Sequence, residues 1–207
     1  AKKLAAKGNT IYSFDLNPFS DNHSNVHSIL ADISKGEDVS RGMQKVRNPI
    51  DMIFNNAGVI RRGDIFQSSE EDFDALFGVH VKGSWLMLKE AHAKLAEHAM
   101  IVQMSSGHAL HPQKDPGLYS LAKQAAAHLV ENIGRDFPNY NVKMIFPGPV
   151  DTPLAIYGLT AEQVIEKKKI MHSAKYVAQK IIELMESDSS TKLEFDDCKE
   201  VWDYILR

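Results

Sequence analysis

Short apolar runs alternate along this chain with longer segments in which apolar residues recur every three or four positions. The runs predict strands over Thr10–Asp15, Val26–Asp32, Ile50–Asn55, Ala99–Ser105 and Asn141–Phe146, and a weaker run predicts another over Lys192–Phe195. Most of the runs are unbroken, which is typical of parallel strands that helices cover on both faces.

The helical period extends over Asp72–His98, Leu118–Phe137, Ala161–Met171 and Ala174–Glu186, and Ala1–Gly8 resembles the end of a further helix. Strands and helices in alternation predict an α/β fold, with a doubly wound parallel sheet between two helical layers. The sequence has no repeat and no interdomain linker, since Ser187–Thr191 is only a short polar loop. We therefore expect residues 1–207 to form a single domain.

Composition narrows the functional classes. The net charge of −3 and the absence of a Lys/Arg run do not indicate a nucleic-acid partner. No apolar run is long enough to span a bilayer, so we expect no membrane partner. Cys198 is the only cysteine, which excludes an internal disulfide and suits a cytoplasmic protein. The histidines at 23, 27 and 111 lack metal-ligand spacing, so we expect no metal site.

Tyr119 and Lys123 are four residues apart on a predicted helix, which places both side chains on one face. A tyrosine hydroxyl has a pKa of about 10 and is a poor base near neutral pH unless a nearby positive charge lowers that pKa. Lowering it to about 7 requires about 4 kcal/mol, which a close lysine and a cationic cofactor ring can supply in a partly dry cleft. Alone, the pair also fits a solvated helix face.

Ser106 adds a second observation. It lies 13 residues before Tyr119, where a predicted strand ends in a Ser/Gly turn. In an open parallel sheet, ligands bind beyond the carboxyl ends of the strands. A hydroxyl there can donate to a substrate oxygen while Tyr119 exchanges its proton. Alternatively, Ser105 and Ser106 only cap the next segment.

Taken together, the motifs resemble the short-chain dehydrogenase/reductase family in order and spacing. NNAG at Asn55–Gly58 follows a strand, Ser106 precedes the YxxxK set of Tyr119 and Lys123, and PGPVDT at Pro147–Thr152 follows the next strand. The resemblance extends from Ala1 to about Leu154. It implies a Rossmann-like domain and an oxidoreductase that transfers a hydride between NAD(H) and an alcohol or ketone.

The resemblance also implies a role for each matching residue. Tyr119 would be the general acid/base, Ser106 would orient the substrate oxygen, and Lys123 would bind the nicotinamide ribose and lower the pKa of Tyr119. Residues implied to bind the cofactor are Asp32 and Ile33 at the adenine, Asn55, Asn56, Ala57 and Gly58 along the channel, and Pro147, Gly148, Val150 and Thr152 at the nicotinamide end. A tight turn can also require Gly58.

Asp15 ends the strand that carries cofactor specificity in this pattern. A carboxylate there accepts hydrogen bonds from the ribose hydroxyls and repels a 2′-phosphate. No Arg or Lys follows closely, so NAD is expected rather than NADP. An aspartate that only stabilises a loop is the alternative.

Two features depart from the family pattern. The glycine-rich loop belongs about 20 residues before the ribose-binding acid, which lies before Ala1. The loop and the first strand are thus absent from this chain, and we expect a gap in the sheet and a fragment of a longer protein. The second departure is His80, where the family usually has an asparagine that holds a water of the proton relay. An imidazole can hold a water too, or His80 can simply fill a helix kink.

Several assignments stay open. His108, His111 and Tyr157 are expected beside the cleft, and Arg61 and Arg62 either meet an anionic substrate or lie in a solvated loop. The helical segments Asp72–His98 and Leu118–Phe137 are the faces through which relatives dimerise, so a homodimer or homotetramer is expected. A dinucleotide-binding or scaffold protein without turnover is the alternative to an enzyme.

Overall fold

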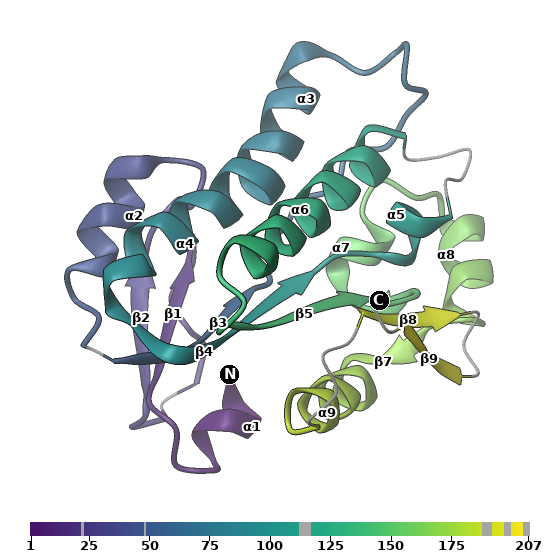
Figure 1. Cartoon of the computed structure of the whole chain (residues 1–207). Helices are drawn as coiled ribbons and strands as arrows, with labels where there is room; N and C mark the ends of the chain where they lie inside the picture. Colours follow the sequence, from purple (N-terminus) through teal and green to yellow (C-terminus); the bar gives the residue numbers. More distant parts are fainter. Residues whose placement is uncertain (22, 48, 112–116, 188–191, 197–199, 205–207) are drawn as a thin grey trace.

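The computed structural model of the chain describes residues 1–207 except 22, 48, 112–116, 188–191, 197–199 and 205–207 (Figure 1). A five-stranded sheet, in the order β3-β4-β5-β8-β9, lies at its centre. Strands β3 (Ile50–Asn55), β4 (Leu95–Met104), β5 (Asn141–Phe146) and β8 (Lys192–Asp196) are parallel, and β9 (Glu200–Tyr204) is antiparallel to β8. The expected α/β architecture with a parallel sheet between helices is confirmed.

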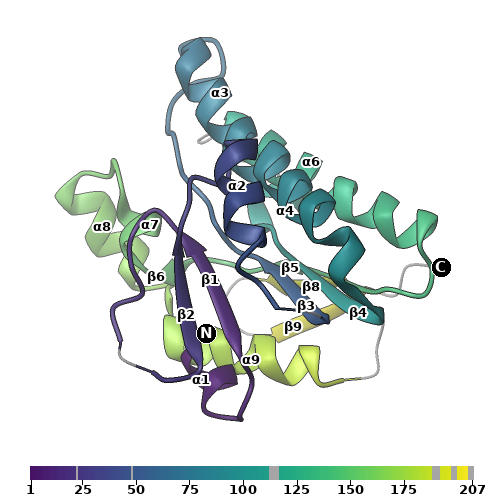
Figure 2. The same ribbon diagram turned by 90° about the vertical axis from the view of Figure 1, so that its left-hand side faces the viewer.

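Helices cover both faces of this sheet (Figures 1 and 2). One layer contains α2 (Gly36–Met43), α3 (Glu70–Phe77), α4 (Ser84–Ala91) and α6 (Gly117–Asp136), and the other contains α1 (Lys2–Ala5) and α9 (Ala174–Met185). Successive side chains of a strand point to opposite faces. Ile101 accordingly packs toward Val130 of α6, while the next residue, Val102, packs toward Ile181 of α9. Burial on both faces explains the unbroken apolar runs.

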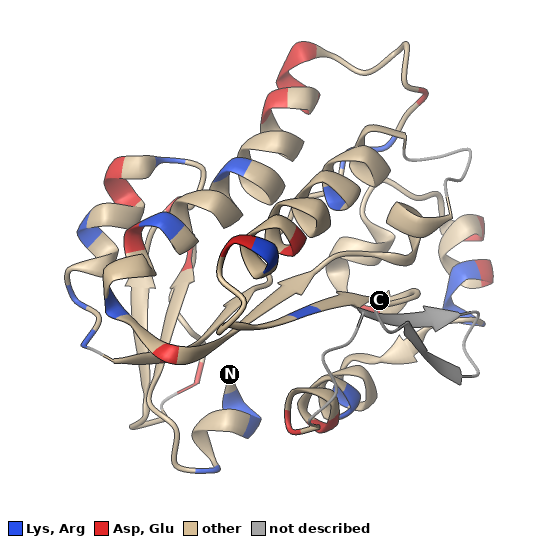
Figure 3. Ribbon diagram, in the orientation of Figure 1, with Lys and Arg blue, Asp and Glu red and all other residues tan. Residues whose placement is uncertain are grey.

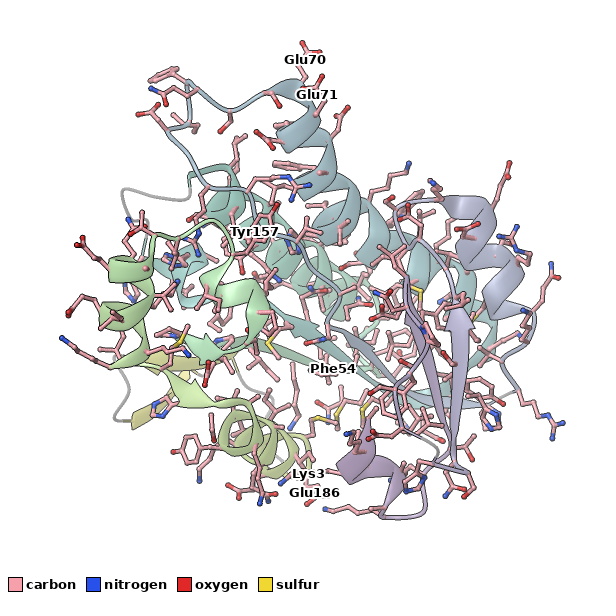
Figure 4. All side chains as sticks on the ribbon, turned by 180° about the vertical axis from the view of Figure 1, so that it is seen from behind. Lys3, Phe54, Glu70, Glu71, Tyr157 and Glu186 are labelled. Carbon is pink, nitrogen blue, oxygen red and sulfur yellow. The ribbon has the colours of Figure 1, made fainter. Side chains whose placement is uncertain are left out.

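The expected gap in the sheet is present. Strands β1 (Ile11–Asp15) and β2 (Val26–Leu30) form a separate two-stranded parallel sheet, and no hydrogen bond between described strands joins it to β3. Phe14 on one side and Ile53 and Phe54 on the other line the space between β1 and β3, and Figure 4 shows Phe54 facing this space. The space continues into the cleft at the carboxyl ends of the strands.

The prediction of one helix over Asp72–His98 is wrong in detail. The segment divides into α3, a π-helical turn over Gly78–Gly83, α4 and a 3₁₀ turn over His92–Lys94, and β4 already begins at Leu95. The residues after Leu95 have good helix propensity, but pairing of Leu95 with Ile50 of β3 outweighs this weak local preference.

The C-terminal part of the described chain crosses from the strand ends to the other face of the sheet. After β6 (Val150–Asp151), the short α7 (Pro153–Ile156) and α8 (Ala161–Lys168) lead to β7 (His172–Ser173), which pairs with β6 and precedes α9. Buried Lys143 of β5 fixes the end of α9, because its Nζ donates to the carbonyls of Leu184 and Ser187 at 2.6 and 2.7 Å. Most of the predicted polar loop 187–191, and Cys198, lie outside the described residues.

Candidate functional site

The carboxyl ends of β3, β4 and β5 open into a cleft that is continuous with the space between β1 and β3, and the two together have a volume of about 1680 Å³. Because the three strands are parallel and adjacent, the residues that follow them meet at one edge of the sheet. Asn55, Ser106 and Pro147 mark these three strand ends and all line the cleft, as do Tyr119 and Lys123 from α6. The structure thus gathers motifs that are almost a hundred residues apart in the sequence.

Helix α6 places Tyr119 and Lys123 against the end of β4. The hydroxyl of Ser105 donates to the backbone carbonyl of Lys123 at 2.9 Å and ties the helix to the strand. Tyr119 and Lys123 are only 8% and 3% exposed, and the side chain of Ser106 lies close enough to Tyr119 to lower its pKa. The amide of His108 also donates to Ser106 Oγ at 3.3 Å, so Ser106 caps the short α5 (Gly107–Leu110) and contacts Tyr119 as well.

The pKa of Tyr119 depends mainly on burial. Burial raises this pKa above its ordinary value, and the hydrogen bond with Ser106 and the charge of Arg62 offset only part of the increase. Burial also lowers the pKa of Lys123 to about 7, and its Nζ donates to the carbonyl of Met104 at 3.0 Å. Lys123 is not among the groups that lower the pKa of Tyr119 in the chain alone, so the lowering expected from the lysine together with a cationic cofactor ring stays a prediction.

His80 lies inside the π-helical turn Gly78–Gly83 and is 1% exposed. Its Nε2 is 2.8 Å from the carbonyl oxygen of Val59 and 3.4 Å from the amide nitrogen of the same residue; the shorter contact assigns the proton to Nε2 and leaves Nδ1 as an acceptor. Burial, and then the charge of Lys123, lower the pKa of His80 to about 3, so the ring is neutral. It meets Tyr119 edge-on, with ring centroids 5.5 Å apart.

Both interpretations of His80 keep support. The ring fills the space at the helix kink. Its buried Nδ1 has no hydrogen-bond partner among the described residues, and a buried acceptor normally has a donor, often a water.

Position 58 requires glycine because neighbouring side chains approach its backbone closely, and not because the backbone turns there. Its φ is not among the positive values of the chain's glycines. A Cβ at this position would lie 2.7 Å from Cε1 of His80, 3.4 Å from Nδ1 of the same ring and 3.6 Å from Nζ of Lys123. A methyl group there would therefore displace the His80 ring, which stands beside Tyr119.

We expect Gly58→Ala to lower the free energy of unfolding by about 1–3 kcal/mol, because an extra methyl in a packed site forces its neighbours to shift. Urea denaturation measures the effect. Gly36→Ala is the matched control, since its Cβ would meet only Leu86 Cδ2 at an ordinary 3.6 Å, and it should be neutral or slightly stabilising. Equal loss in both variants, or none at Gly58, would contradict the close-approach argument.

The residues implied to bind a cofactor line the cleft with one exception. The lining includes Asp15, Ile33, Asn55, Asn56, Ala57, Gly58, Pro147, Gly148, Val150 and Thr152. Asp32 is not among them: its carboxylate accepts from the amide and hydroxyl of Ser34 at 3.0 and 2.6 Å. Asp15 lines the cleft and also accepts from the amide of Asn17 at 2.9 Å, so it stabilises a turn as well.

One structural observation indicates that the site fits a polar, extended cofactor. The side-chain Nδ2 of Asn55 is buried and has no hydrogen-bond partner among the described residues. Unpaired buried donors are costly, so a ligand with acceptor atoms, such as a dinucleotide, would satisfy this group.

The flanking residues divide into two groups. Arg62, His108 and His111 line the cleft, whereas Arg61 and Tyr157 do not. The side chain of Tyr157 is 60% exposed (Figure 4). Sequence reasoning missed the contribution of α9, whose residues Val177, Ala178 and Ile181 also line the cleft; the only signal was the apolar face of that helix.

The remaining expectations concern a metal site, a membrane-spanning helix and contacts between subunits. Among the residues that the structure describes, no group of three or more His, Cys, Asp or Glu side chains is placed to hold a metal ion. In the same part of the chain, no helix combines the length and the apolar character that a membrane crossing requires. Phe73, Trp85 and Leu121 are exposed apolar side chains on the helices expected to form subunit contacts, and oligomerisation through them stays a prediction.

Comparison with known proteins gives one consistent picture. The family model described as short chain dehydrogenase matches residues 1–162. An uncharacterized oxidoreductase of Thermotoga maritima is 30% identical over 125 residues, which cover 58% of this chain and 50% of that protein. The chain spans about half to two thirds of the length of the curated relatives that it matches.

Solved structures share the fold. A short chain dehydrogenase family protein from Francisella tularensis is 25% identical, with a TM-score of 0.78 over 89% of this chain and 83% of that one. A short chain dehydrogenase from Burkholderia cenocepacia, solved in complex with NADP, is 23% identical, with a TM-score of 0.80 over 95% of this chain and 90% of that one.

Proposed function

Since the chain belongs to the short-chain dehydrogenase family, an oxidoreductase family, we propose that it transfers a hydride between NAD(H) and an alcohol or ketone. The observation that carries the proposal is the meeting of three side chains at the cleft. Ser106 and buried Tyr119 line the same cleft, close enough for the Ser106 hydroxyl to lower the pKa of Tyr119, and Lys123 follows one helical turn later on α6. A surface stripe would not bury both a phenol and an ammonium.

Each of these side chains has a definite task in the proposal. A nicotinamide dinucleotide, when bound, supplies or accepts the hydride. During reduction, Tyr119 donates its proton to the substrate oxygen while Ser106 donates a hydrogen bond to the same atom. The raised pKa of Tyr119 keeps its proton in place near neutral pH, which suits reduction. Oxidation requires the phenolate, so its rate should increase with pH.

Lys123 and His80 are proposed to return the proton to Tyr119. Nζ of Lys123 and Nδ1 of His80 both lie within 3.6 Å of the point beside Gly58 where a Cβ would stand. The unpaired Nδ1 can accept a hydrogen bond from a water in this region, which supports His80 as the residue that holds a relay water in place of the asparagine common in the family.

The direct test is the absorbance of NADH or NADPH during incubation of the protein with a panel of ketones and alcohols. Cofactor-dependent turnover of at least one carbonyl compound is expected. Tight cofactor binding without turnover of any compound would instead support a dinucleotide-binding protein, and the absence of both would overturn the proposal.

We propose NAD as the preferred cofactor. The Asp15 carboxylate at the end of β1 is exposed, and its Oδ2 has no partner among the described residues, so it is available to a ribose hydroxyl. The Burkholderia cenocepacia relative was solved with NADP, which makes the preference worth measuring.

Fluorescence titration should give a lower Kd for NADH than for NADPH, by about tenfold or more, because a carboxylate repels a 2′-phosphate. Asp15→Asn should reduce that ratio. Asp51→Asn, which also removes an exposed carboxylate but lies outside the cleft lining, should leave it unchanged. Tighter binding of NADPH to the unmodified chain would contradict the assignment.

A further inference from the structure

Two neighbouring arginines follow β3 and have different surroundings. Nε of Arg61 forms an ion pair with Oδ1 of Asp72 at 3.2 Å, and its side chain does not line the cleft. Arg62 lines the cleft and forms no ion pair with a carboxylate of the described residues. Its side chain is half-buried, so the positive charge is only partly exposed to water.

The position of Arg62 is fixed by the segment that includes α7. Nε donates to the carbonyl of Tyr157 at 2.7 Å, and Nη2 donates to the carbonyl of Ala155 at 2.9 Å. Gly158, at φ +72°, lies against the aliphatic part of the arginine, since a Cβ there would be 3.5 Å from Arg62 Cδ. A guanidinium held in this way loses little side-chain entropy when it binds a ligand.

These two hydrogen bonds occupy one edge of the guanidinium and leave the other edge available. Nη1 and the second hydrogen of Nη2 have no partner among the described residues. The end of a guanidinium that carries Nη1 and Nη2 binds the two oxygens of a carboxylate in parallel. Arg62 therefore offers a pre-positioned, bidentate anion site.

The anion site lies close to the proposed reaction centre. Arg62 and Tyr119 line the same cleft, and the charge of Arg62 lowers the pKa of Tyr119. Elsewhere, acidic and basic residues are interspersed over the outer helices (Figure 3), so the overall field does not concentrate anions. A preference for anions would come from Arg62 itself.

We propose that Arg62 binds the carboxylate of the substrate, so that the cleft selects oxo acids and the corresponding hydroxy acids over neutral ketones and alcohols. The inference rests on the proposed hydride transfer and names its substrate class. The apolar residues Ile60, Leu154 and Leu159 also line the cleft. A short apolar chain between the carbonyl and the carboxylate suits these walls, and a single guanidinium matches the charge of one carboxylate.

Binding without cofactor tests the carboxylate site directly. Calorimetric titration would compare a 2-oxo, a 3-oxo and a 4-oxo acid with their methyl esters. The unmodified chain should bind at least one acid about tenfold or more tighter than its ester, because the ester cannot form the charged pair. Arg62→Gln should remove this preference, and the matched control Arg61→Gln should retain it. Equal affinity of the unmodified chain for acid and ester, or retention of the preference in Arg62→Gln, would overturn the proposal.

The same compounds separate this inference from the proposed function. Turnover of the acids and esters at equal kcat/KM would preserve hydride transfer and overturn the role of Arg62. Selective binding of an acid without turnover of any compound would preserve the role of Arg62 and overturn the proposed hydride transfer. Because Arg62→Gln also loses the hydrogen bonds to Ala155 and Tyr157, the readout is the ratio of the affinity for the acid to the affinity for the ester. A disturbed α7 lowers both affinities, whereas loss of the anion site lowers only the affinity for the acid. Arg62→Lys, which keeps the charge, should restore part of the ratio.

Discussion

Tyr119→Phe is expected to lower kcat/KM by about 10²–10⁴-fold, the range typical for loss of a general acid or base. The variant removes one hydroxyl and leaves the ring, which keeps its edge-on contact with His80 at 5.5 Å and its place among Ile60, Leu76 and Ala122. Ser106 keeps its bond from the amide of His108. Folding should therefore be unaffected, and the loss should appear in kcat.

The measurement is cofactor-coupled turnover, with circular dichroism and a denaturation midpoint as checks of the fold. Tyr176→Phe is the matched control, because Tyr176 is 45% exposed on α9 and outside the cleft lining, and it should retain full activity. Turnover that survives in Tyr119→Phe would end the assignment of this phenol as acid/base.

The fold could be predicted where the local pattern and tertiary packing agree. Ile50–Asn55 and Asn141–Phe146 are strands with the predicted bounds, because their mainly apolar residues pack in the sheet as the local pattern indicates. The helix predicted through Leu95 failed because pairing with Ile50, 45 positions earlier, decides that segment. Helix α2 and strand β9 lack a signal of comparable strength, since α2 is only eight residues long and carries Gly at two positions.

The candidate site could also be predicted from the sequence only in part. Tyr119 and Lys123 share a face by helical geometry alone, and the strand end places Ser106, so the sequence suffices to bring these residues together. The direction of the Tyr119 pKa shift depends on the depth of burial, which the sequence does not contain. Arg61 and Arg62 are equivalent in sequence and differ only through distant partners: Asp72 for one, and the carbonyls of Ala155 and Tyr157 for the other.

Lys123→Met is expected to remove activity and to raise stability in a pH-dependent way. The lysine is 3% exposed, and burial lowers its pKa from 10.5 in the unfolded chain to about 7 in the fold. Between these values the unfolded chain binds a proton that the folded chain lacks, so the wild-type free energy of unfolding rises as pH increases from 7 toward 10. Methionine has no such proton. The variant should be more stable by about 4 kcal/mol near pH 7, and this advantage should shrink by pH 9.5.

Urea denaturation at pH 7 and 9.5 measures the advantage, and turnover should fall by about 100-fold or more, as for other groups that stabilise charge at a reaction centre. The carbonyl of Met104 keeps a hydrogen bond from Gln103 Nε2 at 3.3 Å, so the substitution leaves no acceptor unpaired there. Lys143→Met is the contrasting control: it also removes a buried lysine but loses the two hydrogen bonds by which that lysine holds the end of α9, to the carbonyls of Leu184 and Ser187, and it should destabilise the fold. A destabilised Lys123→Met, or an advantage that grows with pH, would mean that Lys123 is retained for packing rather than for chemistry.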